Sequence, residues 1–191
     1  KMILISQNLS NYEIPIPENS VYRINLAWVN HIKELVTLVE KHKEHSIFVD
    51  LPINRTKPPN NKYTLNDIIT ILEKFDNIRY LAVSNVEKEE DLDQYIKLVP
   101  KTITIVPKIE SHRGVDNIEK IVKKLDYNER IIMLDHDDLY SNLIKSNMSS
   151  DKFSFYINKL AEFSKNQNIT LLRTIGIVFS DETKNVSDYV R

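Results

Sequence analysis

Residues 103–125 read ITIVPKIESHRGVDNIEKIVKKL. The first eight are an apolar, β-branched run typical of a buried strand. The residues after Gly114 carry apolar side chains at intervals of three and four, as in a helix packed on a core. The same alternation recurs along most of the chain and is typical of βα units and a mainly parallel sheet. The pattern predicts an α/β fold.

Similar runs predict the other elements. Strands are expected at 2–6, 21–27, 46–51, 78–84, 103–110, 130–134 and 169–179. Helical stripes are expected within 32–39, 65–72, 92–99, 115–125 and 151–163. Thr64 and Asp67 have the spacing of a capping box at the start of the second stripe. No linker or composition shift divides the chain, so residues 1–191 are expected to form one domain.

The length bears on how the sheet is arranged. A closed (β/α)₈ barrel usually needs about 250 residues, with a lower end near 200, whereas this chain has 191. We expect a compact, trimmed TIM-type barrel, with a helix missing between Asn8 and Ser20 and an abbreviated eighth strand. The alternative is an open, doubly wound sheet.

Composition excludes several classes of function. Lysine plus arginine total 26 against 27 acidic residues, so nucleic acid is not an expected partner. The absence of cysteine removes disulfides and thiolate metal sites. Gly114 and Gly176 are the two glycines, too few for a GxGxxG turn or a P-loop. No apolar run reaches the roughly 20 residues of a membrane span. We therefore expect a cytoplasmic protein with no membrane partner, and assembly into a homo-oligomer is left open.

The most informative residues end the strand at 103–110. Lys108 and Glu110 are two residues apart, so they point to the same side of that strand. In a parallel α/β fold the carboxyl ends of the strands form the functional face, and a cation and a carboxylate directed together into it are costly unless they are used.

A second acidic cluster follows the next strand, at residues 135–138. If the two strands are neighbours, about 4.8 Å apart, Glu110 and one of these aspartates can bind a single hard cation. Oxygen ligands favour Mg²⁺ or Mn²⁺. The alternative is that Asp137 or Asp138 caps the following segment, while Lys108 and Glu110 pair on the surface. Two earlier strands also carry polar residues near their carboxyl ends, namely Arg23, Asn25 and Asp50.

These blocks occur in the order and strand phase of a known barrel. They are Arg23 to Leu26, Phe48 to Leu51, Leu81 to Val86, Lys108 to Val115 and Asp137 to Leu139. Over about residues 20–145 the chain resembles the phosphoenolpyruvate/pyruvate superfamily, most closely the catalytic barrel of pyruvate kinase. It is more loosely similar to the 2-oxo-acid aldolases and citrate lyase β-type lyases.

The resemblance implies roles for particular residues. Glu110 and Asp138 would hold Mg²⁺ or Mn²⁺, and the metal would bind the carboxylate and carbonyl oxygens of the substrate. Lys108 and Arg23 would act on the transferred phosphoryl group or the enolate. Asn25 and Asp50 would line a monovalent-cation site for K⁺.

The chain also departs from pyruvate kinase. Residues 55–63 occupy the place of its lid domain, and residues 137–140 read Asp-Asp-Leu-Tyr where it has Gly-Asp-Leu-Gly. We therefore expect a metal-dependent lyase or aldolase that acts on the enolate of a pyruvate-like 2-oxo acid or on phosphoenolpyruvate, with Lys108 supporting function rather than stability. The alternatives are phosphoryl transfer of the pyruvate kinase kind, and a non-catalytic barrel that serves as a binding or interaction module.

Overall fold

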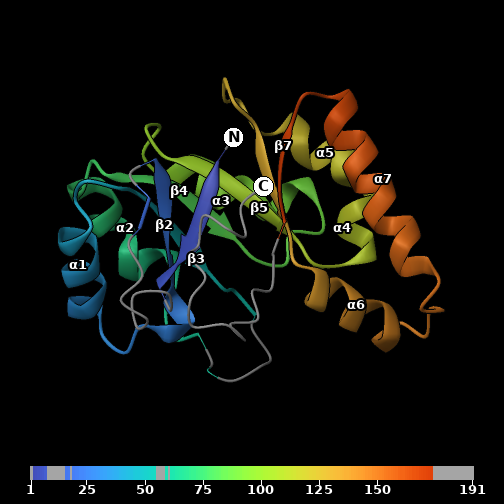
Figure 1. Ribbon diagram of the computed structural model, residues 1–191, viewed down its shortest axis with the longest axis horizontal. Coiled ribbons are helices and arrows are strands. Elements are labelled where there is room, and N and C mark those ends of the chain that lie inside the picture. The colour runs from blue at the N-terminus through green and yellow to red at the C-terminus, as the bar shows by residue number, and fades with distance from the viewer. Residues whose placement is uncertain (1, 8–15, 18, 55–58, 60, 174–191) are drawn as a thin grey trace.

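The structure is a computed structural model that describes residues 2–7, 16–17, 19–54, 59 and 61–173. Its described residues form one α/β domain with a single curled sheet (Figure 1). The strands are β1 Ile3–Ser6, β2 Ser20–Asn25, β3 Ser46–Leu51, β4 Ile78–Val83, β5 Thr104–Ile109, β6 Ile131–Leu134 and β7 Thr170–Arg173. All seven lie within predicted strand regions or one residue beyond them. Residues 174–179 of the last prediction lie outside the described residues.

Helices and short 3₁₀ turns connect the strands. They are η2 Leu26–Trp28, α1 Ile32–Lys41, α2 Leu65–Lys74, η3 Glu89–Leu92, α3 Asp93–Leu98, α4 His112–Asp116, α5 Ile118–Lys123, α6 His136–Lys145 and α7 Lys152–Asn166. The predicted capping box is present, because the backbone N–H of Thr64 donates to Asp67 Oδ2 over 2.7 Å. The helix predicted for 115–125 breaks into α4 and α5 at Asn117, and α6 was not predicted.

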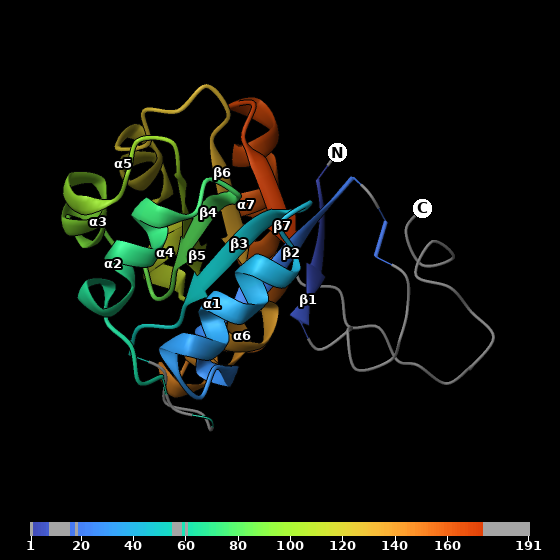
Figure 2. The same ribbon diagram turned by 90° about the vertical axis from the view of Figure 1, so that its left-hand side faces the viewer.

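The strands are ordered β1 to β7 as in the sequence, and every neighbouring pair is parallel. Because crossovers between parallel strands are right-handed, a strictly sequential order winds the chain in one direction and places the helices on one face. Figure 2 shows this side of the sheet covered by α1, α2 and α3. The doubly wound alternative is therefore wrong, since it requires a reversal of strand order.

The predicted closed barrel is also wrong, and the described strands form a half-barrel. No pairing within the described residues joins β1 to β7. Closure of a (β/α)₈ barrel uses eight strands whose tilt and stagger bring the last beside the first. The described part of the chain contains seven strands, of which both outer ones are four residues long.

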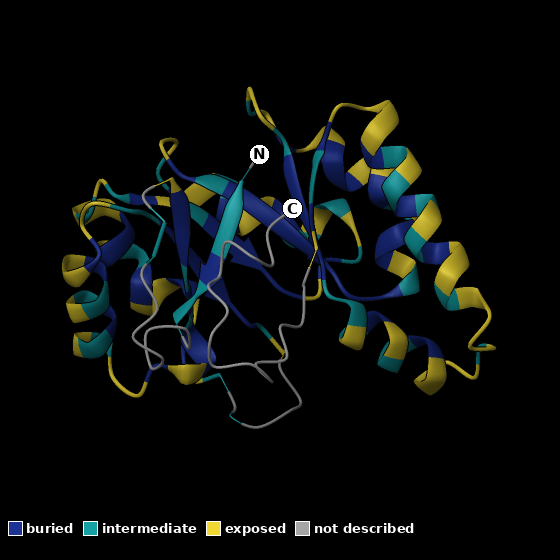
Figure 3. Cartoon of the chain, viewed as in Figure 1, coloured by how far each residue is buried: buried dark blue, intermediate teal, exposed yellow. Residues whose placement is uncertain are grey.

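Both faces of the sheet are apolar. The larger core lies between the sheet and the helices, and Figure 3 shows the central strands largely buried. A smaller cluster on the other face comprises Val21, Phe48, Ala82, Val106, Ile131, Met133 and Leu172. Burial on both faces explains why these strands read as nearly continuous apolar runs. None of the described helices is both long enough and apolar enough to cross a membrane.

A histidine is built into the core at the end of α1, away from the carboxyl ends of the strands. The ring of His42 stacks on Tyr22 with centroids 3.7 Å apart, and its side chain is buried. Its Nε2 has no hydrogen-bond partner within the described part of the chain. Burial lowers the pKa of His42 below its usual 6.5, and the neighbouring Lys41 and His45 add to the effect.

This arrangement predicts a loss of stability in acid. Because the pKa of His42 is lower in the folded state, the unfolded chain takes up a proton first as the pH falls below about 6.5. The contribution of neutral His42 is complete above that pH and is lost as the pH falls through the folded-state pKa. Unfolding of the parent and of His42→Phe, which keeps a ring against Tyr22, should be compared between pH 8 and 5. The variant should show a smaller pH dependence, whereas the exposed control His31→Asn should match the parent. An unchanged slope in His42→Phe would exclude this role.

Candidate functional site

The candidate site lies at the carboxyl ends of the strands, where β2, β3 and β5 each contribute a charged side chain. Arg23 Nε donates to Asp50 Oδ2 over 3.1 Å, and the guanidinium also forms an ion pair with that oxygen. Lys108 Nζ lies 3.5 Å from Asp50 Oδ2 and 3.0 Å from Glu110 Oε1. The charges therefore alternate along one row, Arg23, Asp50, Lys108 and Glu110.

The middle of this row is buried. The exposed fractions are 5% for the Lys108 side chain, 0% for Asp50 and 4% for Glu110. Lys108 also donates to Ser84 Oγ over 3.2 Å. Lys108 and Glu110 point to the same side, as strand alternation predicts. The alternative that they pair on the surface is wrong, because both lie beneath the molecular surface.

Attraction between the charges outweighs the effect of burial at Asp50 and Lys108, but not at Glu110. Burial alone would raise the pKa of Asp50, but Lys108 and Arg23 outweigh it and lower that pKa. Burial alone would lower the pKa of Lys108, but Asp50 and Glu110 outweigh it and raise that pKa. Burial raises the pKa of Glu110, against the opposing effects of the Lys108 ammonium and a hydrogen bond from the Asn85 backbone. The raised pKa of Lys108 therefore favours its ammonium form, which pairs with both carboxylates.

Three carboxylates gather at the Glu110 end of the row. One oxygen from each of Glu110, Asp135 and Asp138 lies within 4.8 Å of the others. Asp135 ends β6 and is the N-cap of α6, where its side chain accepts a hydrogen bond from the Asp138 N–H over 3.2 Å. The sequence placed Asp135 in the acidic cluster at 135–138, but the resemblance selected Asp138, and not Asp135, as the partner of Glu110. The position of Asp135 directly after an apolar strand and three residues before Asp138 is the signal that indicates an N-cap.

The spacing fits a small hard cation. Mg²⁺ binds oxygen at about 2.1 Å, so two ligands on opposite sides of the ion are about 4.2 Å apart. Neighbouring ligands of an octahedral ion are only about 3.0 Å apart, so the three oxygens, which lie within 4.8 Å of one another, would move closer together to share one ion. One oxygen of the buried row, Asp50 Oδ1, has no hydrogen-bond partner among the described residues.

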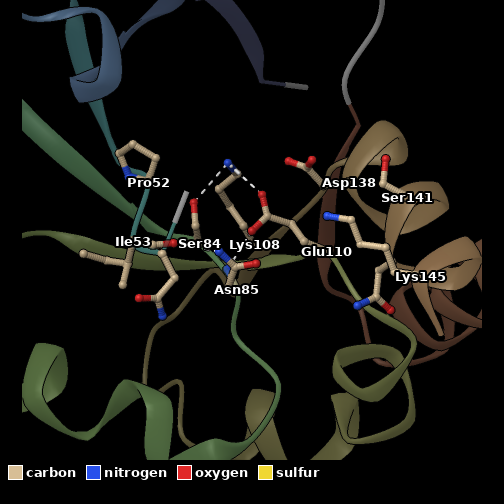
Figure 4. Close-up of a pocket in the computed structure, with 11 residues that line it drawn as sticks. Pro52, Ile53, Ser84, Asn85, Lys108, Glu110, Asp138, Ser141 and Lys145 are labelled. Carbon is tan, nitrogen blue, oxygen red and sulfur yellow. Dashed lines mark hydrogen bonds and ion pairs between the residues drawn. The ribbon is translucent and has the colours of Figure 1, made fainter. Parts of the chain in front are cut away.

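A small cavity opens beside these groups, with a volume of about 170 Å³. Figure 4 shows Lys108 and Glu110 on one side of it and Asp138, Ser141 and Lys145 from α6 on the other. The lining comprises Pro52, Ile53, Asn54, Ser84, Asn85, Lys108, Glu110, Asp138, Ser141, Asn142 and Lys145. A second cavity of about 390 Å³ shares Ile53, Asn54, Ser84 and Asn85 with the first.

Two predicted site residues are placed differently. Asn25 is not among the residues that line the cavity, and its side chain caps η2 by accepting from the Ala27 N–H over 3.0 Å. Arg23 is turned toward Asp50, so it supports the buried row. The proposed K⁺ site at Asn25 and Asp50 stays a prediction.

The two histidines near the site make local contacts. His112 Nδ1 lies 2.9 Å from Asn142 Oδ1. His136 Nε2 lies 3.2 Å from Arg173 Nη2. Burial lowers the pKa of His136, and the Arg173 charge adds to this effect. The contact of His112 with Asn142 of α6 fits a structural role.

Comparison with known proteins supports the fold. No family model matches the chain, and no curated protein matches it. Among solved structures, RipC from Yersinia pestis is similar with a TM-score of 0.60 and 14% identity, over 94% of this chain and 77% of RipC. At that identity the likeness shows the fold alone.

These findings contradict the predicted assignment to the phosphoenolpyruvate/pyruvate superfamily. The described strands form a half-barrel and not the closed barrel that the resemblance implied, and no family model supports the assignment. Of the short sequence blocks on which it was based, only the one at residues 108–115 is specific, and the others are weak alone and count mainly by their order. Any function must therefore be argued from the site itself.

Proposed function

We propose that the protein is a divalent-metal-dependent enzyme that stabilises the enolate of a small, pyruvate-like 2-oxo acid. The observation that carries this proposal is a buried ammonium, Lys108, beside a cluster of three carboxylates, two of which, Glu110 and Asp138, line one small cavity. A cavity of about 170 Å³ is below the range of about 300–1,000 Å³ typical of sites for larger ligands. A compact, acidic substrate suits it best.

The donor set favours Mg²⁺ or Mn²⁺. Glu110, Asp135 and Asp138 offer carboxylate oxygens, which hard divalent cations prefer. When bound, such a cation supplies Lewis acidity that draws electron density away from the carbonyl of a 2-oxo acid.

The protein's own groups would supply the remaining electrostatic stabilisation. Lys108 is protonated and fixed by Asp50, Glu110 and Ser84, so its charge is in place before the reaction begins. Arg23 holds the other side of Asp50 and acts on the site through it. A protonated, ion-paired Lys108 disfavours Schiff-base chemistry, which needs a neutral amine.

The adjoining cavity favours carbon–carbon bond cleavage or formation. It is larger, at about 390 Å³, and shares four lining residues with the first. A second reactant or leaving fragment held there would lie next to an enolate in the smaller cavity. This supports a lyase or aldolase over phosphoryl transfer.

Deuterium exchange tests the proposal without knowledge of the second reactant. Stabilising the enolate of pyruvate lets a C3 proton leave and a deuteron from D₂O replace it, which NMR detects. Exchange should require Mg²⁺ or Mn²⁺, stop with chelator and be lost in Glu110→Gln, whereas Glu119→Gln on the surface of α5 should be as active as the parent. No exchange above buffer with metal present would contradict the proposal. Turnover of phosphoenolpyruvate with ADP at roughly 1–1,000 per second would favour phosphoryl transfer instead.

A second candidate is a non-catalytic binding module. Lys108 already has two carboxylate partners, at 3.0 and 3.5 Å, and this favours a structural ion network. A module of this kind would bind the metal and a small acid without exchanging the C3 protons of pyruvate.

A further inference from the structure

Two asparagines that line the cavity, Asn54 and Asn85, have a backbone conformation that most residues avoid. Asn85, in the loop after β4, has φ of 57°, in the left-handed region. Asn54, Asn147 and Asn168 are the other non-glycine residues with positive φ among those described. Asparagine tolerates this region better than other side chains, but a left-handed residue still costs energy and needs a reason.

For two of these four asparagines, the end of a helix explains the positive φ. Asn147 and Asn168 follow the last turns of α6 and α7, where a left-handed residue ends a helix. The residues after them complete the caps, because Met148 N–H donates to Leu143 O over 3.0 Å and Ile169 N–H donates to Ser164 O over 2.8 Å. Asn85 follows a strand and ends no helix.

Asn85 makes two hydrogen bonds at the site, one from its backbone and one from its side chain. Its backbone N–H donates to Glu110 Oε2 over 2.6 Å. Its side-chain Nδ2 donates to the Ile53 carbonyl over 2.7 Å, which ties the loop after β4 to the loop after β3. Asn85 also lines both cavities, and Figure 4 shows it beside Ser84 and Glu110.

Glu110 is thereby held from two sides. Lys108 Nζ contacts Oε1 at 3.0 Å, and Asn85 N–H contacts Oε2. A carboxylate has about four lone-pair positions, so each oxygen keeps one for a cation. Two fixed donors leave Glu110 one orientation, which faces Asp135 and Asp138.

We propose that Asn85 is a positioning residue, whose left-handed backbone aims its N–H at Glu110 and fixes that carboxylate for the cation. The part that concerns the cation rests on the proposed function. Partners of a ligand are typically worth about 10–100-fold in metal affinity. The backbone N–H carries the role, while the side-chain bond to Ile53 fastens the loop.

Two substitutions separate backbone from side chain. Asn85→Gly removes the amide side chain but adopts a positive φ readily, whereas Asn85→Ala penalises that φ. We expect Asn85→Ala to weaken Mn²⁺ binding by about tenfold or more and Asn85→Gly to bind nearly as the parent does. Asn147→Ala and Asn147→Gly are matched controls at a helix end, and neither should change Mn²⁺ affinity even if Asn147→Ala lowers the melting temperature.

A second measurement needs no metal. The ¹³C resonance of the Glu110 carboxylate in the metal-free protein should shift in Asn85→Ala and stay near its parent position in Asn85→Gly. If Asn85→Ala leaves both this resonance and Mn²⁺ affinity unchanged, the inference is wrong. It is also wrong if Asn85→Ala and Asn85→Gly lose Mn²⁺ affinity to the same extent. If the resonance responds as expected but the parent binds no Mn²⁺, the positioning role stands and the proposed function fails.

Discussion

Lys108→Met should lower the free energy of unfolding by about 3–5 kcal/mol at neutral pH, the range found when one partner of a buried ion pair is removed. Methionine keeps much of the apolar stem but leaves Asp50 and Glu110, both nearly inaccessible to solvent, without the ammonium between them. Arg23 still neutralises one oxygen of Asp50. The sequence favoured a role for Lys108 in function rather than stability; its burial between two carboxylates indicates a role in stability, and the role in function stays a prediction.

Denaturant unfolding at several pH values checks this result. The variant should recover part of its deficit in acid, because a protonated carboxyl group no longer needs a cationic partner. Lys145→Met is the matched control. It removes the same charge from the same cavity, but Lys145 is exposed, so its stability should stay within about 0.5 kcal/mol of the parent. Equal stability of parent and Lys108→Met would show that the buried network contributes nothing net.

Glu110→Gln should weaken Mn²⁺ binding by more than the 10–100-fold typical of residues that only support a ligand. Glutamine keeps the size of the side chain but has one acceptor oxygen, so it loses the negative charge and keeps only one of the two contacts that Asn85 N–H and Lys108 make with separate oxygens of Glu110. Of the three clustered carboxylates, Glu110 is the buried one. Neither water nor another side chain can therefore easily take the place of Glu110 as a ligand.

Calorimetric titration of Mn²⁺ into both proteins measures this effect. Glu119→Gln provides the control, because it makes the same chemical change at an exposed glutamate paired with Lys123. Binding that is as tight in Glu110→Gln as in the parent would place any metal elsewhere.

The sequence predicted the elements better than their assembly. Buried parallel strands leave runs such as residues 46–51 that are readable without a structure, and all seven observed strands lie at these positions. Closure depends on the tilt, stagger and length of strands far apart in the chain, which local periodicity does not encode. Helix α6 was missed because its buried apolar residues are Leu139 and Leu143 alone, too few to show a stripe.

The candidate site was predicted in part for similar reasons. Alternation along β5 correctly placed Lys108 and Glu110 on one side, and the end of β6 correctly located an acidic cluster. Alternation does not show depth, so the burial of Lys108 was missed. Asp135 contributes through a helix cap, and Asn85 contributes through a left-handed turn. Their hydrogen-bond partners depend on how the loops are arranged in space, which local sequence patterns do not show.

The most direct test of the account is the binding of Mn²⁺ to the parent protein, followed by electron paramagnetic resonance with and without oxalate, a mimic of the pyruvate enolate. We predict one bound Mn²⁺ per chain and a changed spectrum when oxalate joins the site, with both effects lost in Glu110→Gln. Absence of bound Mn²⁺, or a bound ion whose spectrum does not change when oxalate is added, would contradict a metal-dependent enolate site at these carboxylates.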